Sequence, residues 1–205
     1  MNLLEKYIAL SNDQLNRLHA FTELLLEWNQ KINLISRKDT EHIIERHILH
    51  SLGVHVLEKI KPGFDVLDVG TGGGLPGIPL AIIYPKTNFV LADSIQKKIR
   101  ATSDMVKKLD LPNVTCINAR VETLQQKFEI VTGRAVMRLI DFHKLTHHLL
   151  LKDGTYLLLK GGDLSDEIKE YEGVSGLKVK LHDLYKSFPE SFFQSKFVLE
   201  ITNKR

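Results

Sequence analysis

The sequence predicts an α/β fold, in which a mostly parallel sheet is covered by helices on both faces and preceded by a helical extension. Three observations support this prediction. Strand-like and helix-like segments alternate after residue 63, a glycine-rich turn follows the first strand-like run, and only a short loop separates the last two strand-like runs. Alternation at this spacing is typical of βαβ units, whose parallel strands are buried on both sides.

Residues 1–60 are predicted to form the helical extension. Ser11 and Gln14 fit the capping box that begins a helix, and apolar residues then recur at helical spacing. After a short loop, Asp39 can cap a second helix that runs to about Ile60, where a Lys-Pro-Gly sequence ends it. We therefore expect two helices in front of the sheet.

Residues 61–205 are predicted to form one compact unit around the sheet. We expect five parallel strands, at 64–69, 88–93, 114–118, 128–133 and 154–160. We expect helices between them, at about 78–84, 95–109 and 139–150. Two further strands follow, at 177–182 and 197–201. The loop between these two is too short for a crossover helix, so they should pair antiparallel at the sheet edge and complete seven strands.

The composition is that of an ordinary soluble globular protein. The 205 residues are 43% hydrophobic and 26% charged, which suits one domain with a small extension. Apolar runs are too short for a membrane span, and no signal segment opens the chain. Cys116 is the only cysteine and lies in an apolar run, so it is expected to be buried filler in a cytoplasmic protein. The net charge of +3 permits an RNA partner without requiring one.

The glycine-rich turn fits two cofactor patterns. Residues 72–77 satisfy the dinucleotide pattern G-x-G-x-x-G, which glycine clusters meet easily. Asp68 also stands two residues before the alternating glycines Gly70, Gly72 and Gly74. A carboxylate there would repel a pyrophosphate but attract the ammonium of S-adenosylmethionine, so we favour the methyltransferase pattern. A packing turn that binds nothing is the remaining interpretation.

Other candidate site residues follow the next three strands, at the carboxyl edge of the sheet where ligands bind. Asp93 can accept hydrogen bonds from the ribose hydroxyls of an adenosine cofactor, or it can cap the next helix. Val121 can pack against an adenine, whereas Glu122 can flank the adenine or cap a helix. Arg134 is either a cation facing cofactor and RNA or a surface residue.

Basic residues form several short runs that either contact RNA or make solvated surfaces: Arg37, Lys38, Arg46, Lys97, Lys98 and Arg100. No aromatic residues are interleaved with them, so the sequence does not indicate a stacking platform for single strands. His143 and His147 have helical metal-pair spacing but lack a matching third ligand. We therefore predict no metal site, and the absence of a G-x-S-x-G elbow argues against a serine hydrolase.

A series of motifs occurs in order along nearly the whole chain: Asn33-Leu34, RHILHSL at 46–52, LDVGTGGGLPGIPLA at 67–81, Asp93-Ser94, Lys97-Lys98, Arg120-Val121-Glu122, Arg134-Ala135 and Lys160-Gly161. Together they resemble the bacterial small-subunit rRNA guanine-N7 methyltransferases, also called glucose-inhibited division protein B. The resemblance implies a class I, Rossmann-like methyltransferase fold over 61–205. It also implies a cytoplasmic enzyme, expected to be a monomer without a membrane partner.

The resemblance further implies methyl transfer from S-adenosylmethionine to N7 of one guanine in 16S rRNA, with S-adenosylhomocysteine as product. The implied cofactor residues are Gly70, Gly72, Gly74 and Leu75 on the methionine side, Asp93 at the ribose, and Val121 and Glu122 at the adenine. Arg134 would lie at the mouth between cofactor and substrate, and Lys160 on the RNA side. Guanine N7 carries no proton, so no residue is assigned as a catalytic base.

The chain departs from the family pattern at three places. His50 stands where many members carry Asp, Ile35 where Thr is common, and Met137-Arg138 after Arg134 is atypical. These departures concern RNA docking more than the cofactor site. Three other functions remain open: methylation of another RNA or a small molecule, NAD-dependent oxidoreduction, and cofactor-sensing RNA binding without turnover.

Overall fold

The computed structural model describes residues 3–135 and 137–202, which form a seven-stranded sheet of order β3-β2-β1-β4-β5-β7-β6. The parallel strands are β1 Asp65–Val69, β2 Asn88–Asp93, β3 Val114–Asn118, β4 Phe128–Arg134 and β5 Leu150–Gly161. The remaining two are β6 Val179–Asp183 and β7 Lys196–Thr202, and β7 pairs antiparallel with both β5 and β6. The predicted α/β fold with its antiparallel end is confirmed.

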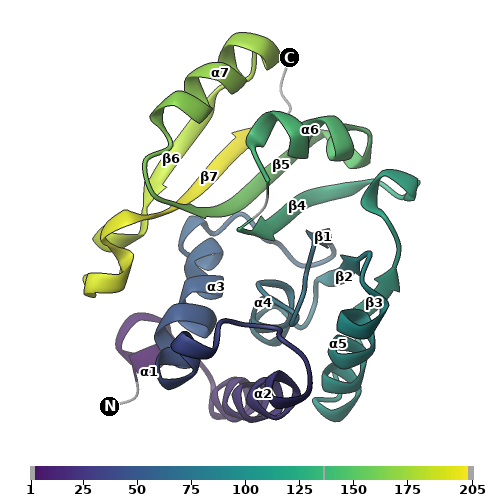
Figure 1. Ribbon diagram of the computed structural model, residues 1–205, viewed down its shortest axis with the longest axis vertical. Coiled ribbons are helices and arrows are strands. Elements are labelled where there is room, and N and C mark those ends of the chain that lie inside the picture. The colour runs from purple at the N-terminus through teal and green to yellow at the C-terminus, as the bar shows by residue number, and fades with distance from the viewer. Residues whose placement is uncertain (1–2, 136, 203–205) are drawn as a thin grey trace.

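Helices cover both faces of this sheet. They are α1 Leu3–Tyr7, α2 Asn12–Lys31, α3 His50–Leu52, α4 Gly77–Ile83, α5 Gln96–Lys108, α6 Leu139–Thr146 and α7 Ser165–Ser175. Figure 1 shows α2, α4 and α5 on one side of the sheet and α6 and α7 on the other. Among the helices of residues 3–135 and 137–202, none combines the length and apolar character needed to cross a bilayer.

Alternate side chains of each strand build two separate cores. On β1, Val66 packs in the core beneath α2 and α4, whereas Leu67 and Val69 pack in the core beneath α6 and α7. The first core also contains buried residues of the extension, such as Leu18 and Leu52. The extension therefore packs on one face of the sheet.

The second part of the extension differs from the prediction of one helix over 39–60. It consists of a 3₁₀ segment Arg37–His42, a π-helix Ile44–Leu49, the short α3 and a 3₁₀ segment Gly53–Leu57. Residues 47–54 are all buried, which a regular helix with one apolar face does not achieve. The wider π turn and the tighter 3₁₀ turn redirect side chains in this enclosed segment.

Two further elements differ from the sequence prediction. The helix predicted over 139–150 ends at Thr146, and Leu150 already begins β5, where it pairs with Phe128. The apolar residues between α6 and β5 suit a helix as well as a strand, so the hydrophobic periodicity of the sequence does not locate the boundary between the two elements. The helix α7 was not predicted because Tyr171 is its only buried residue, which leaves a weak amphipathic pattern.

Candidate functional site

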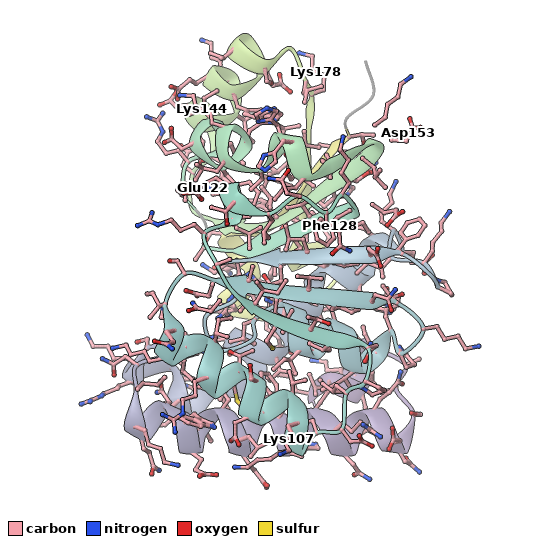
Figure 2. The ribbon with its side chains drawn as sticks, turned by 90° about the vertical axis from the view of Figure 1, so that its right-hand side faces the viewer. Lys107, Glu122, Phe128, Lys144, Asp153 and Lys178 are labelled. Carbon is pink, nitrogen blue, oxygen red and sulfur yellow. The ribbon has the colours of Figure 1, made fainter. Side chains whose placement is uncertain are left out.

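The predicted site residues that follow β1 to β4 lie at the carboxyl edge of the sheet. Figure 2 shows Glu122, which follows β3, on one side of the view, with Phe128 at the start of β4 and Asp153 near the start of β5 toward the other. The ends of β1, β2, β3 and β4 therefore share the edge on which Glu122 lies. This is the edge where open α/β sheets bind ligands.

The glycine turn between β1 and α4 presents bare backbone to solvent. Gly70, Gly72 and Gly74 have φ values of 68°, 56° and 83°, a region that favours glycine. A Cβ atom would meet no neighbour within 4 Å at Gly70 and only a carbonyl oxygen at 3.8 Å at Gly72. The Gly72 N–H donates to Asp93 Oδ2 at 3.0 Å, and its carbonyl accepts from Thr102 Oγ1 at 2.8 Å. The turn is thus fixed from two sides while its outer surface stays open.

We expect Gly74→Ala to destabilise the fold by about 1–3 kcal/mol, because alanine is strained at this positive φ. Its Cβ would also lie 2.4 Å from Ile78 Cδ1. Chemical denaturation measures the change. Gly173→Ala is the matched control, since it lies in α7 at an open position, where alanine should be neutral or stabilising. Equal stabilities of the two variants would contradict the expectation.

Asp68 lies beneath this turn and is fully buried. Its Oδ2 accepts from Thr71 Oγ1 at 2.6 Å and from the Gly77 N–H at 2.9 Å, while Oδ1 has no partner. A Cβ at Gly77 would lie 2.8 Å from Oδ2, so glycine permits this close approach. Burial raises the pKa of Asp68 to about 6. Asp68 organises the turn from below, and its predicted attraction for a cofactor ammonium would act across the turn.

We expect Asp68→Asn to raise stability at pH 7 by up to about 3 kcal/mol and to leave it unchanged at pH 4. The asparagine oxygen can accept both existing hydrogen bonds without a buried charge. The folded pKa, about 6, exceeds the ordinary 3.8, so the stability tied to the Asp68 proton is complete below pH 3.8 and lost as pH rises through 6. Urea denaturation at both pH values checks this. A variant less stable than wild type at pH 7 would contradict it.

Asp93 ends β2 and is 7% exposed. One of its oxygens accepts from Gly72, and the other accepts from the Ile95 N–H at 2.9 Å. Each oxygen keeps a second acceptor position for a ribose hydroxyl. The alternative that Asp93 caps the next helix is wrong, because the N-cap of α5 is Ile95 and no side chain caps that helix. Ile95, which sequence reasoning missed, is 41% exposed beside it. An exposed apolar side chain directly after the acidic residue was the available signal.

Val121 and Glu122 begin the 3₁₀ turn that follows β3. Because Asp93 pairs with Asn118 across β2 and β3, this turn lies at the same edge as Asp93. Val121 is half-buried, whereas Glu122 is exposed and lies 3.9 Å from Arg120. Glu122 caps no helix through its side chain, which leaves it available at the edge.

A cavity of about 720 Å³ opens beside the outer surface of the turn. Its walls include seven of the predicted residues: Gly70, Gly72, Leu75, Arg134, Arg46, Lys98 and Lys160. The other predicted residues do not line this cavity. Asp93 ends β2, whereas Val121 and Glu122 follow β3. Asp68 and Gly74 are buried at the turn. The remaining four are exposed cations: Arg37, Lys38, Lys97 and Arg100. The structure thus brings together residues from the extension, the turn and the ends of β4 and β5.

Arg134 is held in this cavity by a histidine of the π-helix. Its guanidinium donates to His47 Nδ1 at 2.7 Å. Since arginine can only donate, Nδ1 must accept, and the neutral ring carries its proton on Nε2. Burial and the neighbouring Arg134 lower the pKa of His47 to about 4, which keeps the ring neutral. Burial also lowers the pKa of Arg134 to about 10, so Arg134 stays charged at neutral pH.

Carboxylates neutralise two of the other predicted cations. Arg46 pairs with Asp39 at 2.6 Å, and Lys160 pairs with Glu167 of α7. Lys98 also lines the cavity, and no carboxylate of the described residues forms an ion pair with it. Within the wall, positive charge therefore remains at Arg134 and Lys98, and at Lys196, which sequence reasoning missed.

The three family departures have identifiable structural places. His50 is buried, with its ring edge-on to Phe192 at 5.5 Å, and burial lowers its pKa to about 3. Ile35 lines the cavity and donates its N–H to Asn29 Oδ1 at 3.0 Å. Arg138 pairs with Glu170 of α7 beside the cavity.

His143 of α6 and His147 of the following 3₁₀ turn have the spacing of a metal pair but are held in ring contacts and hydrogen bonds. His143 and His147 stack with centroids 5.8 Å apart, and His143 Nδ1 hydrogen-bonds to the Tyr171 hydroxyl. In the part of the chain that the structure describes, no group of three His, Cys, Asp or Glu residues is arranged to hold a metal ion.

Comparison with known proteins identifies the family. The sequence model of the rRNA small subunit methyltransferase G family matches residues 14–191. A ribosomal RNA small subunit methyltransferase G from Christiangramia forsetii is 43% identical, over 100% of this chain and 98% of the relative. One from Bacteroides fragilis is 42% identical, over 98% of this chain and 100% of the relative.

Solved structures show the same fold at low identity. Magnesium protoporphyrin IX methyltransferase from Synechocystis, with bound S-adenosylmethionine, superposes with a TM-score of 0.65 at 16% identity, covering 96% of this chain and 100% of that one. An S-adenosylmethionine-dependent methyltransferase from Aquifex aeolicus gives 0.60 at 15% identity, covering 78% and 92%. The family match and the full-length relatives show that the chain belongs to the rRNA small subunit methyltransferase G family.

Proposed function

We propose that the protein transfers a methyl group from S-adenosylmethionine to N7 of a specific guanine in the 16S rRNA of the small ribosomal subunit. One observation carries the proposal: the cavity joins the glycine turn of a methyltransferase fold to cations from the extension, α5, β4, β5 and β7. It acts as a monomer in the cytoplasm. An NAD-dependent oxidoreductase is disfavoured, because buried Asp68 beneath the turn would repel a pyrophosphate.

The residues at the turn fit an adenosine cofactor with a methionine tail. Asp93 offers free acceptor positions to the ribose hydroxyls, and Ile95 and Val121 offer apolar surface to the adenine. Gly70 and Gly72 leave open backbone for the methionine part, with Leu75 beside them in the cavity wall. S-adenosylmethionine supplies an electrophilic methyl group on its sulfonium.

The chain's contribution to the reaction is positioning. Guanine N7 has a free lone pair and no proton, so the enzyme needs no base. Holding N7 in line with the methyl group can supply about 7–11 kcal/mol of the barrier reduction. Arg134, fixed by His47, lies in the wall between the turn and the rest of the cavity, where it can orient the base. Lys98 contacts the RNA backbone, and the exposed Arg37, Lys38, Lys97 and Arg100 attract RNA from outside. Lys160 lines the RNA side of the same wall but is already paired with Glu167.

Methyl transfer to small subunits from a strain that lacks the gene tests the proposal. Tritiated S-adenosylmethionine should label the 16S rRNA, and nucleoside digestion should give 7-methylguanosine. Label in another nucleoside or in a small molecule would favour the alternative methyltransferases. An N7-methyl mark retained in the deletion strain, or saturation by NADH but not by S-adenosylmethionine, would overturn the proposal.

A further inference from the structure

We propose that Phe192 is the stacking platform for the target guanine, an inference that rests on the proposed function. Phe192 belongs to the 3₁₀ segment Ser191–Ser195, just before β7. Among the described residues that line the cavity, it is the single Phe, Tyr or Trp side chain. It is half-buried, so part of its ring is accessible from the cavity.

The ring is braced by its neighbours. His50 meets it edge-on, at a centroid distance of 5.5 Å and an interplanar angle of 79°. Phe193 also meets it edge-on, at 5.1 Å and 83°, and is itself fully buried. A ring fixed by two perpendicular neighbours loses little further freedom when a base stacks on it.

Cations surround the same ring. Lys196 Nζ lies over it at 5.0 Å from the centroid, and Arg46 Cζ at 5.8 Å. Lys196 faces Gly161 in the β5–β7 pairing, at the carboxyl end of β5. When a nucleotide enters, the flexible Lys196 ammonium can leave the ring face and bind the phosphate, while the base takes its place.

The reaction requires such a platform. In A-form RNA, N7 faces a deep and narrow major groove that side chains cannot enter, so the target guanine must be unstacked or single-stranded. An unstacked base loses its stacking neighbours, and an aromatic ring replaces them in a way that every base can use. The same cavity contains Arg134 and the glycine turn, so a base on Phe192 stays within the space that the cofactor shares.

The test compares Phe192→Leu with Phe192→Trp in steady-state methylation. Leucine keeps apolar volume against His50 and Phe193 but removes the aromatic face, whereas tryptophan restores one. We expect Phe192→Leu to raise KM for the RNA substrate about tenfold with little change in S-adenosylmethionine affinity, and Phe192→Trp to stay near wild type. Tyr185→Leu, an exposed aromatic outside the cavity, is the matched control.

Three outcomes would overturn the inference: wild-type KM in Phe192→Leu, equal impairment of the Leu and Trp variants, or a parallel loss of S-adenosylmethionine binding. The wild-type enzyme in the same assay separates this failure from that of the proposed function. If wild type forms no 7-methylguanosine, the proposed function fails. If it does while Phe192→Leu behaves like wild type, only the stacking platform fails.

Discussion

Replacing Asp93 with alanine is expected to weaken S-adenosylmethionine binding at least about a hundredfold, because hydrogen bonds to a charged group contribute about 1.5–3 kcal/mol each. Two ribose hydroxyls would lose their acceptors. The variant also frees the Gly72 N–H, which Asp93 now holds at 3.0 Å, so the turn itself loses a support. Isothermal titration calorimetry with S-adenosylmethionine measures the loss.

Asp65→Ala is the control for this experiment. Asp65 begins β1 at the opposite edge of the sheet, where its carboxylate accepts from Asn88 at 2.9 Å and from Gln126 at 3.2 Å. Its removal also deletes a strand-end carboxylate with two hydrogen bonds, yet far from the turn. Unchanged affinity in Asp93→Ala, or equal losses in both variants, would show that Asp93 does not hold the ribose.

Replacing Arg134 with alanine is expected to lower kcat/KM for the RNA substrate at least about a hundredfold, since truncating one partner of a buried charged contact costs about 2–5 kcal/mol of binding. The change removes the cation whose charge faces Asp68 and leaves His47 Nδ1 without its donor. The target guanine and the methyl group of S-adenosylmethionine then lose the guanidinium that His47 holds in place. Initial methylation rates across RNA concentrations measure the effect.

Two variants separate position from charge in this prediction. Arg134→Lys keeps the charge but loses the planar fork, so it should recover only part of the activity. Arg138→Ala removes an arginine that is 61% exposed and pairs with Glu170 next to the cavity, and it should leave the rate near wild type. An Arg134→Ala enzyme with the wild-type rate and normal stability would remove Arg134 from the site.

The strands were predictable from the sequence because their signals are local. The predicted ranges 88–93 and 114–118 coincide with β2 and β3. β2 is buried along most of its length and so forms an apolar run, whereas the edge strand β3 has no buried residue and is recognised by its β-branched residues. The segment over 39–60 failed for a physical reason. Its apolar spacing fits a helix, but periodicity does not report the π-helix Ile44–Leu49, in which the three consecutive residues His47, Ile48 and Leu49 are all buried.

The part of the site that directly follows predicted strands could be located from the sequence. Asp93 and the glycine turn are consecutive with strands that the sequence reveals, so their edge follows from topology. Phe192 and Lys196 had no such signal. They reach the cavity because β7 inserts next to β5 and runs antiparallel, which brings the beginning of β7 to the end of β5. The sequence predicted an antiparallel pair but not that β7 would be the strand beside β5.

The insertion of β7 between β5 and β6 also dictates when a newly made chain becomes competent. The edge strand β6 is synthesised before β7. Among the described strands, however, β7 is the only neighbour of β6 in the sheet, and it is synthesised last. Until β7 docks, β6 has no strand to pair with, and the wall that carries Phe192 and Lys196 is unbuilt. The strands beside the glycine turn can pair during synthesis. The cavity wall that carries Phe192 and Lys196 is complete only after the last strand has emerged. A chain shortened before β7 would therefore keep the proposed surface for S-adenosylmethionine but lack part of the proposed surface for RNA.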